Sequence, residues 1–297
     1  MGRNETVLGS FILSLLLLFA HAGSSQAART PAFDSLHQWY VDHYPFFSME
    51  DTVYTFEGEY ELPEGFTRPD STELTPFQFW VSHFPLWHRH KPIGQWRGGR
   101  AFQADEVSRA VHLPWRGRYF RDYAIPFRVL AEYLFYQNRR HDLRVIPPLG
   151  DTLRYEDWLT GRPATTAQGE IIFQPAEKRD PGPYEYYAYL AFIMRSTSYR
   201  DLAQNCDSIQ TEQVAPGDLF IAHDQKNRSG VVYVVLNMLC NDRGQRLYTV
   251  ATGCAEACDF HIPKLNSDRH NPWVTIEQIQ ALGAEFSHAG FFRLKIR

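Results

Sequence analysis

Three stretches of the chain have the hydrophobic spacing of helices. Residues 75–84 begin with Thr-Pro, a cap followed by a first-turn proline, and place their large apolar side chains on one face. Residues 123–136 (YAIPFRVLAEYLFY) repeat apolar positions at helical spacing, with Asp122 in front as a candidate cap and Pro126 marking where the regular helix begins. The spacing predicts another long helix over residues 184–203.

Alternating or continuous apolar runs predict the strands. Residues 52–62 and 104–113 alternate, and residues 170–173 form a short candidate strand in a loop rich in Gly, Pro, Thr and Gln. The C-terminal third predicts an antiparallel meander, in which each strand pairs with the next along the chain. Its three strands are residues 219–222, 231–239 and 245–251.

Ahead of these elements, residues 7–20 (VLGSFILSLLLLFA) form an unbroken run of apolar and small residues. The run is too short to span a bilayer comfortably, and small residues follow it where a signal peptidase cuts. We therefore expect a signal peptide over residues 1–27 and a periplasmic or secreted protein with no membrane span in its mature form. The alternative is a retained N-terminal anchor. No lipid anchor is expected, because the first cysteine is Cys206.

Composition and charge narrow the classes of partner. The 297 residues are 44% hydrophobic and 22% charged, as in ordinary folded proteins. The formal net charge is -4, and no basic run is long enough to hold a nucleic-acid backbone. Nucleic acid is therefore not an expected partner.

The cysteines are even in number, which favours disulfides in an exported protein. Of the three pairings that four cysteines allow, the predicted meander favours one. Cys240 ends its second strand beside the start of the first, close to Cys206, while Cys254 and Cys258 lie together beyond the opposite end. We therefore predict Cys206–Cys240 and Cys254–Cys258. A zinc site is not favoured, because no C-x2-C pair is present.

Two other clusters have the composition of binding sites. His83, His88 and His90 resemble a metal cluster, but no further ligand can be identified, so neither a metal nor another cofactor is expected. The tyrosine-rich start of the helix predicted over residues 184–203 offers a stacking surface for sugar rings, although such a stripe is more often core.

The order of several short motifs carries more information than any one of them. They are an FxxWxxxxPL segment (residues 77–86), a helix ending in AEYL (131–134), a W-x2-G-R loop (158–162), ST-S-x3-L (196–202), GDLFI (217–221), an apolar strand (231–236), an AxxxxxAxxxH loop (251–261) and PW (272–273). From about residue 60 onward, this order resembles a family of exported bacterial proteins known as domain of unknown function 4846.

The resemblance implies a fold and a chemistry. Members of that family typically carry a Cys at the start of the helix that ends in AEYL and a Gly-His-Ala step that opens the strand after GD-x-FI. A Cys at a helix N-terminus facing a His is the arrangement of papain-like and NlpC-like cysteine hydrolases, because both the helix dipole and the imidazole lower the thiol pKa. By analogy, the family is similar to amide or peptide hydrolases.

This sequence departs from the family at both positions. Counting along the motifs, the Cys falls on Asp122 and the His on Val231. A carboxylate at a helix N-terminus is expected to act as a cap, worth ~1 kcal/mol, and a valine that opens an apolar strand is expected to pack. In the loop of residues 251–261, two cysteines occupy positions that would border the cleft, where a disulfide would stiffen the rim.

We therefore expect an α+β protein of papain-like or NlpC-like type. Its C-terminal antiparallel sheet packs on the helix at 123–136, and an N-terminal extension (residues 28–70) precedes the main domain (residues 71–297). The favoured function is that of an exported, catalytically degenerate relative that binds a cell-envelope peptide or glycan. The residues expected to line the inherited cleft are Asp122, His223, Val231, Thr252, Cys254 and His261.

Two alternatives remain open. A carboxylate and an imidazole suffice for general acid and base chemistry, so a hydrolase with relocated groups would use Asp122 with His223 or His261. The third hypothesis is a structural envelope protein with no small ligand.

Overall fold

The computed structural model describes residues 31–113, 117–226 and 228–296. The predicted signal peptide (residues 1–27) lies outside the described residues. The chain divides into two compact units, residues 1–39 and 40–297, and helix α2 (Pro31–His43) contains the boundary between them. The larger unit contains every predicted site residue.

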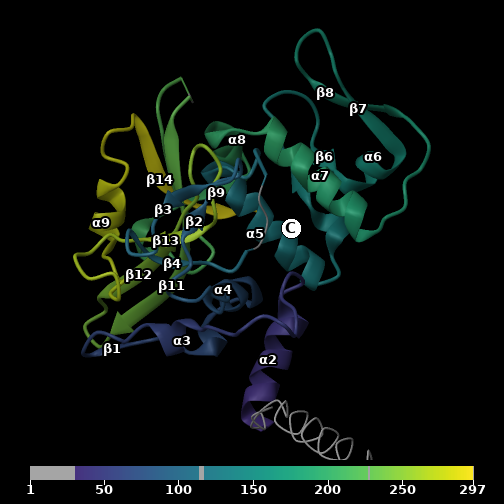
Figure 1. Ribbon diagram of the computed structural model, residues 1–297. Coiled ribbons are helices and arrows are strands. Elements are labelled where there is room, and N and C mark those ends of the chain that lie inside the picture. The colour runs from purple at the N-terminus through teal and green to yellow at the C-terminus, as the bar shows by residue number, and fades with distance from the viewer. Residues whose placement is uncertain (1–30, 114–116, 227, 297) are drawn as a thin grey trace, which may run out of the picture. The chain divides into compact units, whose positions relative to one another are not determined.

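The larger unit contains an antiparallel six-stranded sheet, the largest of its sheets (Figure 1). Its strand order is β1-β11-β10-β14-β9, and β12 also pairs with β11. The strands are β1 (Phe66–Thr67), β9 (Cys206–Ile209), β10 (Leu219–His223), β11 (Gly230–Asn241), β12 (Arg246–Ala251) and β14 (His288–Leu294). The predicted meander is confirmed, since β10, β11 and β12 are its three strands.

Apolar side chains on one face of the sheet pack under helix α9 (Ile276–Ala281). Phe220 of β10, Val235 of β11 and Ile279 of α9 belong to one buried cluster. Met238 belongs to this cluster, so the neighbouring residue on the strand, Asn237, points to the other face of the sheet. There its side chain donates a hydrogen bond of 3.1 Å to the carbonyl of Ser82 in α4 (Pro76–Ser82). The sheet is therefore covered by helices on both faces, as its continuous apolar strand predicts.

The sheet order separates two cysteines that were predicted to pair. Cys206 lies on β9 and Cys240 on β11, with β14 and β10 between them. Three strand spacings amount to about 14 Å, whereas the Cα atoms of a disulfide lie within about 7 Å. The predicted Cys206–Cys240 bond is wrong, and both cysteines are free. The error arose because β14 inserts beside β10, which the three-strand meander did not include.

The second predicted disulfide is confirmed. Cys254 and Cys258 are bonded, and their Cα atoms are 5.3 Å apart. They lie in the loop between β12 and β13 (His261–Pro263). This loop is therefore closed covalently within five residues.

The predicted helices form, with one change. Helix α4 begins after Thr75, whose hydroxyl and the side chain of Gln78 make a reciprocal capping box. A short 3-10 turn, η2 (Asp122–Ala124), leads into α5 (Ile125–Tyr136), so the regular helix begins near Pro126 as predicted. The helix predicted over residues 184–203 is instead two, α7 (Pro183–Ser196) and α8 (Tyr199–Gln204).

The break between α7 and α8 has a sequence cause. Thr197 and Ser198 both adopt extended backbone angles, and Ser198 is the residue that precedes α8. Serine is a preferred N-cap residue, and the Ser198 hydroxyl donates to the carboxylate of Asp201, in the first turn of α8, at 2.6 Å. The apolar spacing on either side concealed this interruption.

Two predicted strands change. Residues 52–62 contain a short helix, α3 (Phe56–Glu59), because the hydroxyl of Thr55 accepts a hydrogen bond from the amide of Gly58 and starts a helical turn. The strand predicted over residues 104–113 is shorter, β4 (Val107–Ala110), and pairs with β13. The candidate strand at 170–173 forms as β8 (Ile171–Pro175), paired with β7 (Gly161–Thr165).

The remaining elements are small and complete a mixed α+β fold. They are η1 (Ser71–Glu73), β2 (Ile93–Gly94), β3 (Arg100–Phe102), η3 (Arg140–Asp142), β5 (Arg144–Val145), β6 (Leu153–Arg154), α6 (Tyr155–Thr160) and η4 (Thr211–Gln213). Within the described ranges, no helix has both the length and the apolar character needed to cross a membrane.

Candidate functional site

Asp122, the predicted replacement for the family's cysteine, is a buried carboxylate. It opens η2, is 4% exposed, and accepts hydrogen bonds from the hydroxyl of Tyr199 at 3.0 Å and 3.1 Å from its two oxygens. The N-cap residues of η2 and α5 are Arg121 and Ala124, so Asp122 does not occupy the predicted N-cap position, although its carboxylate bonds to the backbone amide of Tyr123. The partner that sequence reasoning missed is Tyr199, which α8 places beside the start of α5.

The surroundings of Asp122 shift its titration toward neutrality. Burial raises the pKa of its carboxyl from 3.8 to about 6, because the charged form loses its hydration. The Tyr199 hydroxyl and the backbone amides of Tyr123 and Val232 oppose this shift by bonding to the charged form. Asp122 is thus a carboxyl that changes charge near neutral pH.

The loop after β12 passes directly over the start of η2. The amide of Asp122 donates to the carbonyl of Cys254 at 3.3 Å. A Cβ on Gly253 would lie 2.5 Å from Cδ1 of Ile125 and 3.3 Å from the Cα of Asp122, so a larger residue there would require the end of the Ile125 side chain to move. This loop therefore covers the start of η2 at Asp122.

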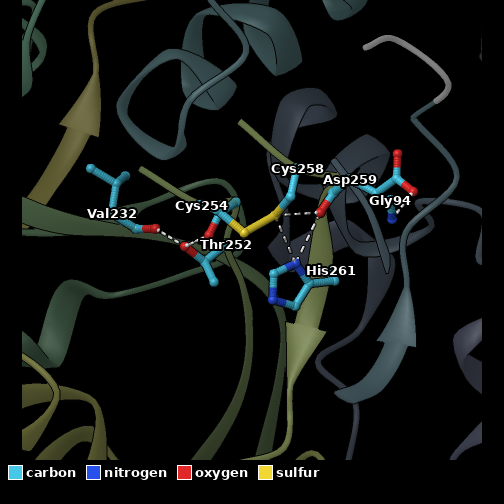
Figure 2. The surroundings of a disulfide bond; sticks show 8 residues. Gly94, Val232, Thr252, Cys254, Cys258, Asp259 and His261 are labelled. Atoms are coloured by element: carbon cyan, nitrogen blue, oxygen red, sulfur yellow. Dashed lines mark hydrogen bonds between the residues drawn. A yellow bond between two sulfur atoms is a disulfide. The ribbon is translucent and has the colours of Figure 1, made fainter. Parts of the chain in front are cut away.

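Figure 2 shows the Thr252 hydroxyl beside the Val232 carbonyl and the His261 ring beside the disulfide. The Thr252 hydroxyl donates to the carbonyl of Val232 at 2.6 Å, and the Thr252 and His261 backbones exchange hydrogen bonds of 2.8 Å and 2.9 Å. These contacts join the loop to β11 and β13. Of the predicted cleft residues, Cys254 contacts the backbone of Asp122, while Thr252 and His261 hold the two ends of the same loop.

The imidazole of His261 is buried and hydrogen-bonded within its own loop. It is 3% exposed, and its Nδ1 donates to the carbonyl of Asp259 at 2.9 Å. Burial lowers the pKa of His261, which favours the neutral ring. Its Nδ1 also lies 3.9 Å from Sγ of Cys258, but that sulfur is in the disulfide and Cys258 is 3% exposed.

Val231, the predicted replacement for the family's histidine, packs as expected. It lies on β11 opposite Ala222 and contacts the buried cluster under α9. Its neighbour Val232 is the residue whose amide bonds to Asp122. The strand therefore passes beside the carboxylate, but the side chain at 231 is directed into apolar packing.

His223 lies at the end of β10, apart from the loop of Thr252. Its ring stacks on that of His288 in β14, with centroids 5.0 Å apart, and its Nδ1 donates to the carbonyl of Asp224 at 2.9 Å. No hydrogen bond or ion pair joins Asp122 to an imidazole among the described residues. The predicted six-residue cleft is therefore divided between two places.

His223 instead lines a cavity of about 750 Å³. The cavity lies at the break between α7 and α8, and its wall includes Arg195, residues 196–198, Arg200 and Lys226. Sequence reasoning noted the ST-S-x3-L motif only as a family resemblance and did not predict that its hydroxyls line a cavity. The consecutive hydroxyls followed by Arg200 were the signal that could have identified it.

The remaining candidate sites are absent or structural where the structure describes them. No group of three or more His, Cys, Asp or Glu is arranged to hold a metal ion in the described part of the chain. In the tyrosine-rich helix α7, Tyr186 and Tyr189 are fully buried, so they are core, while Tyr184 is exposed.

Comparison with known proteins agrees with the motif order. No curated protein and no solved structure matches the chain. The sequence model of the family described as "Domain of unknown function (4846)" matches residues 56–291, which include Asp122, Tyr199, the disulfide and the cavity wall. The chain therefore belongs to the domain of unknown function 4846 family.

Proposed function

We propose that this protein is an exported, non-hydrolytic member of its family that binds a peptide or glycan component of the cell envelope. The observation that supports this most directly is Asp122. Where the resemblance implies a cysteine nucleophile, the chain has a carboxylate that is 4% exposed and bonded through both oxygens to Tyr199. A nucleophile must reach its substrate, whereas this group is held inside the protein.

The environment of Asp122 favours binding over hydrolysis. The proposed histidine position, Val231, contributes an apolar side chain to the sheet cluster. The loop over Asp122 is closed by the Cys254–Cys258 disulfide, which suits an oxidising compartment. Export itself rests on the apolar run at residues 7–20 and on this disulfide.

The test uses the protein without residues 1–27 and isolated cell-wall sacculi. The protein is expected to co-sediment with the sacculi, while the supernatant gains neither amino groups nor reducing sugar ends over the no-protein control. Release of either product would overturn the non-hydrolytic assignment. Failure to co-sediment would overturn envelope binding and leave the structural hypothesis.

A second candidate is supported by one observation. The raised pKa of Asp122, about 6, is in the range of catalytic acids and bases. A hydrolase of this kind would use Asp122 with an imidazole, and it would release product from sacculi in an Asp122-dependent manner. The variant Asp122→Asn separates the two candidates, with His270→Gln, at an exposed histidine, as its control. Product release that is lost in Asp122→Asn and kept in His270→Gln would establish the hydrolase.

A further inference from the structure

The cavity at the break between α7 and α8 has the size of a ligand pocket. Its volume is about 750 Å³, within the range of roughly 300–1,000 Å³ that is usual for small-molecule sites. The walls come from the end of α7, the start of α8, and the ends of β10 and β14. Elements that are distant in sequence therefore converge on it.

The charge in this pocket is opposite in sign to that of the whole protein. Arg195, Arg200 and Lys226 line it, and the acidic residue among its described lining is Asp201. The Asp201 carboxylate accepts a hydrogen bond from the Ser198 hydroxyl at 2.6 Å, and burial raises its pKa. In a chain of net charge -4, three cations around one cavity create a local site that attracts anions.

The pocket also holds hydrogen-bond donors. Thr197 lines it and is 6% exposed, and its hydroxyl has no hydrogen-bond partner among the described residues. Buried hydroxyls are nearly always bonded, so the Thr197 hydroxyl can take a water or a ligand group as its partner. The stacked rings of His223 and His288 also line the pocket.

We propose that this pocket binds the anionic group of a small ligand, a phosphate ester or a carboxylate, through Arg200, Lys226 and the Thr197 hydroxyl. Arginine and lysine both bind these oxyanions by charge-assisted hydrogen bonds, and the threonine hydroxyl adds a neutral donor. The inference goes beyond the proposed function, because the pocket does not include Asp122 and its ligand need not belong to the envelope.

The test is calorimetric titration of the purified protein with glucose 6-phosphate, citrate and uncharged glucose. At least one of the two anions is expected to bind and glucose is not. The anion that binds distinguishes a phosphate from a carboxylate source. Absence of binding by both anions, or equal binding of glucose, would overturn the proposal.

A matched pair of double variants locates the binding. Arg200→Ala/Lys226→Ala removes two pocket cations, and Arg243→Ala/Lys264→Ala removes two exposed cations elsewhere, so each changes the formal net charge from -4 to -6. The pocket variant is expected to lose at least about tenfold in affinity and the control to keep it. Equal losses in the two would show only nonspecific attraction and would refute the assignment.

Thr197 provides a test that is separate from charge. Thr197→Val keeps the shape and removes a hydroxyl that has no internal partner among the described residues, so folding stability is expected to hold while anion affinity falls several-fold. Thr197→Ser is expected to retain affinity. Full affinity in the valine variant would remove Thr197 from the site. Sacculus binding that survives in the absence of anion binding would reject this inference and leave the proposed function standing.

Discussion

Replacement of Asp122 by asparagine should change how the stability of the protein depends on pH. The carboxyl titrates at 3.8 in a model compound and at about 6 in the folded protein, because burial disfavours its charge. The folded state therefore binds the proton more tightly than the unfolded state does. The stabilisation from this group is complete below the unfolded pKa and is lost as the pH rises through the folded pKa.

The size of the effect follows from the shift. A difference of about two pKa units corresponds to roughly 3 kcal/mol, most of it lost between about pH 4 and pH 7.5. The amide of the Asp122→Asn variant cannot ionise and does not incur this loss. The free energy of unfolding of the wild type, minus that of the variant, should therefore fall by about 2 to 3 kcal/mol across this interval.

Urea unfolding followed by the fluorescence of the seven tryptophans measures both proteins at each pH. The other buried carboxyls titrate in the same way in both proteins, so their contributions to the free energy of unfolding cancel when one protein is subtracted from the other. Any constant cost of the amide, such as a poorer contact with the Val232 amide, shifts the difference curve without changing its slope. Asp105→Asn, at an exposed carboxylate, is the control, and the difference in unfolding free energy between the wild type and this variant should not change with pH. If the difference between the wild type and Asp122→Asn is also independent of pH, burial does not raise the pKa of Asp122.

The remaining predictions concern the hydrogen bond to Asp122, a buried ion pair and the disulfide. Tyr199→Phe removes the hydroxyl donor to both Asp122 oxygens and should cost about 1.5 to 3 kcal/mol of unfolding free energy above neutral pH, and less in acid, in the same urea assay. Arg128→Met leaves the fully buried carboxylate of Glu132 without its ion-pair partner and should cost about 3 to 5 kcal/mol, which additional replacement of Glu132 by Leu should largely restore. Thiol titration in denaturant without reductant should find two thiols, since the Cys254–Cys258 disulfide leaves two cysteines free; four or none would contradict it.

Local chemistry could be predicted from the sequence where a single segment determines it. Thr75 and the proline after it start α4, and Pro126 fixes where α5 becomes regular, because caps and prolines act within one turn. The Cys254–Cys258 bond lies within one short loop and was equally predictable. These features need no knowledge of the rest of the fold.

Two of the errors concern contacts between distant segments. The Cys206–Cys240 prediction failed because β14, which follows Cys240 along the chain, pairs between β10 and β9. The partner of Asp122 was missed because Tyr199 is 77 residues away and reaches it only after the chain breaks between α7 and α8. The periodicity of a segment says which face is apolar, but not which distant group it meets.

The break between α7 and α8 positions both the cavity wall and the partner of Asp122. By ending α7 at Ser196 and restarting at Tyr199, the chain places residues 196–198 in the wall of the cavity and the ring of Tyr199 beside Asp122. Gly230 lies close to Tyr199 as well: a Cβ there would be 2.5 Å from the carbonyl oxygen of Ala222 and 3.0 Å from the Tyr199 ring. Tyr199 holds Asp122 by buried hydrogen bonds, and Asp122 is not among the residues that line the cavity, whereas Arg195, Arg200 and Lys226 are. The proposed anion site in the cavity is therefore the first place to look for ligand recognition, and the Asp122 hydrogen bond joins the start of α8 to η2.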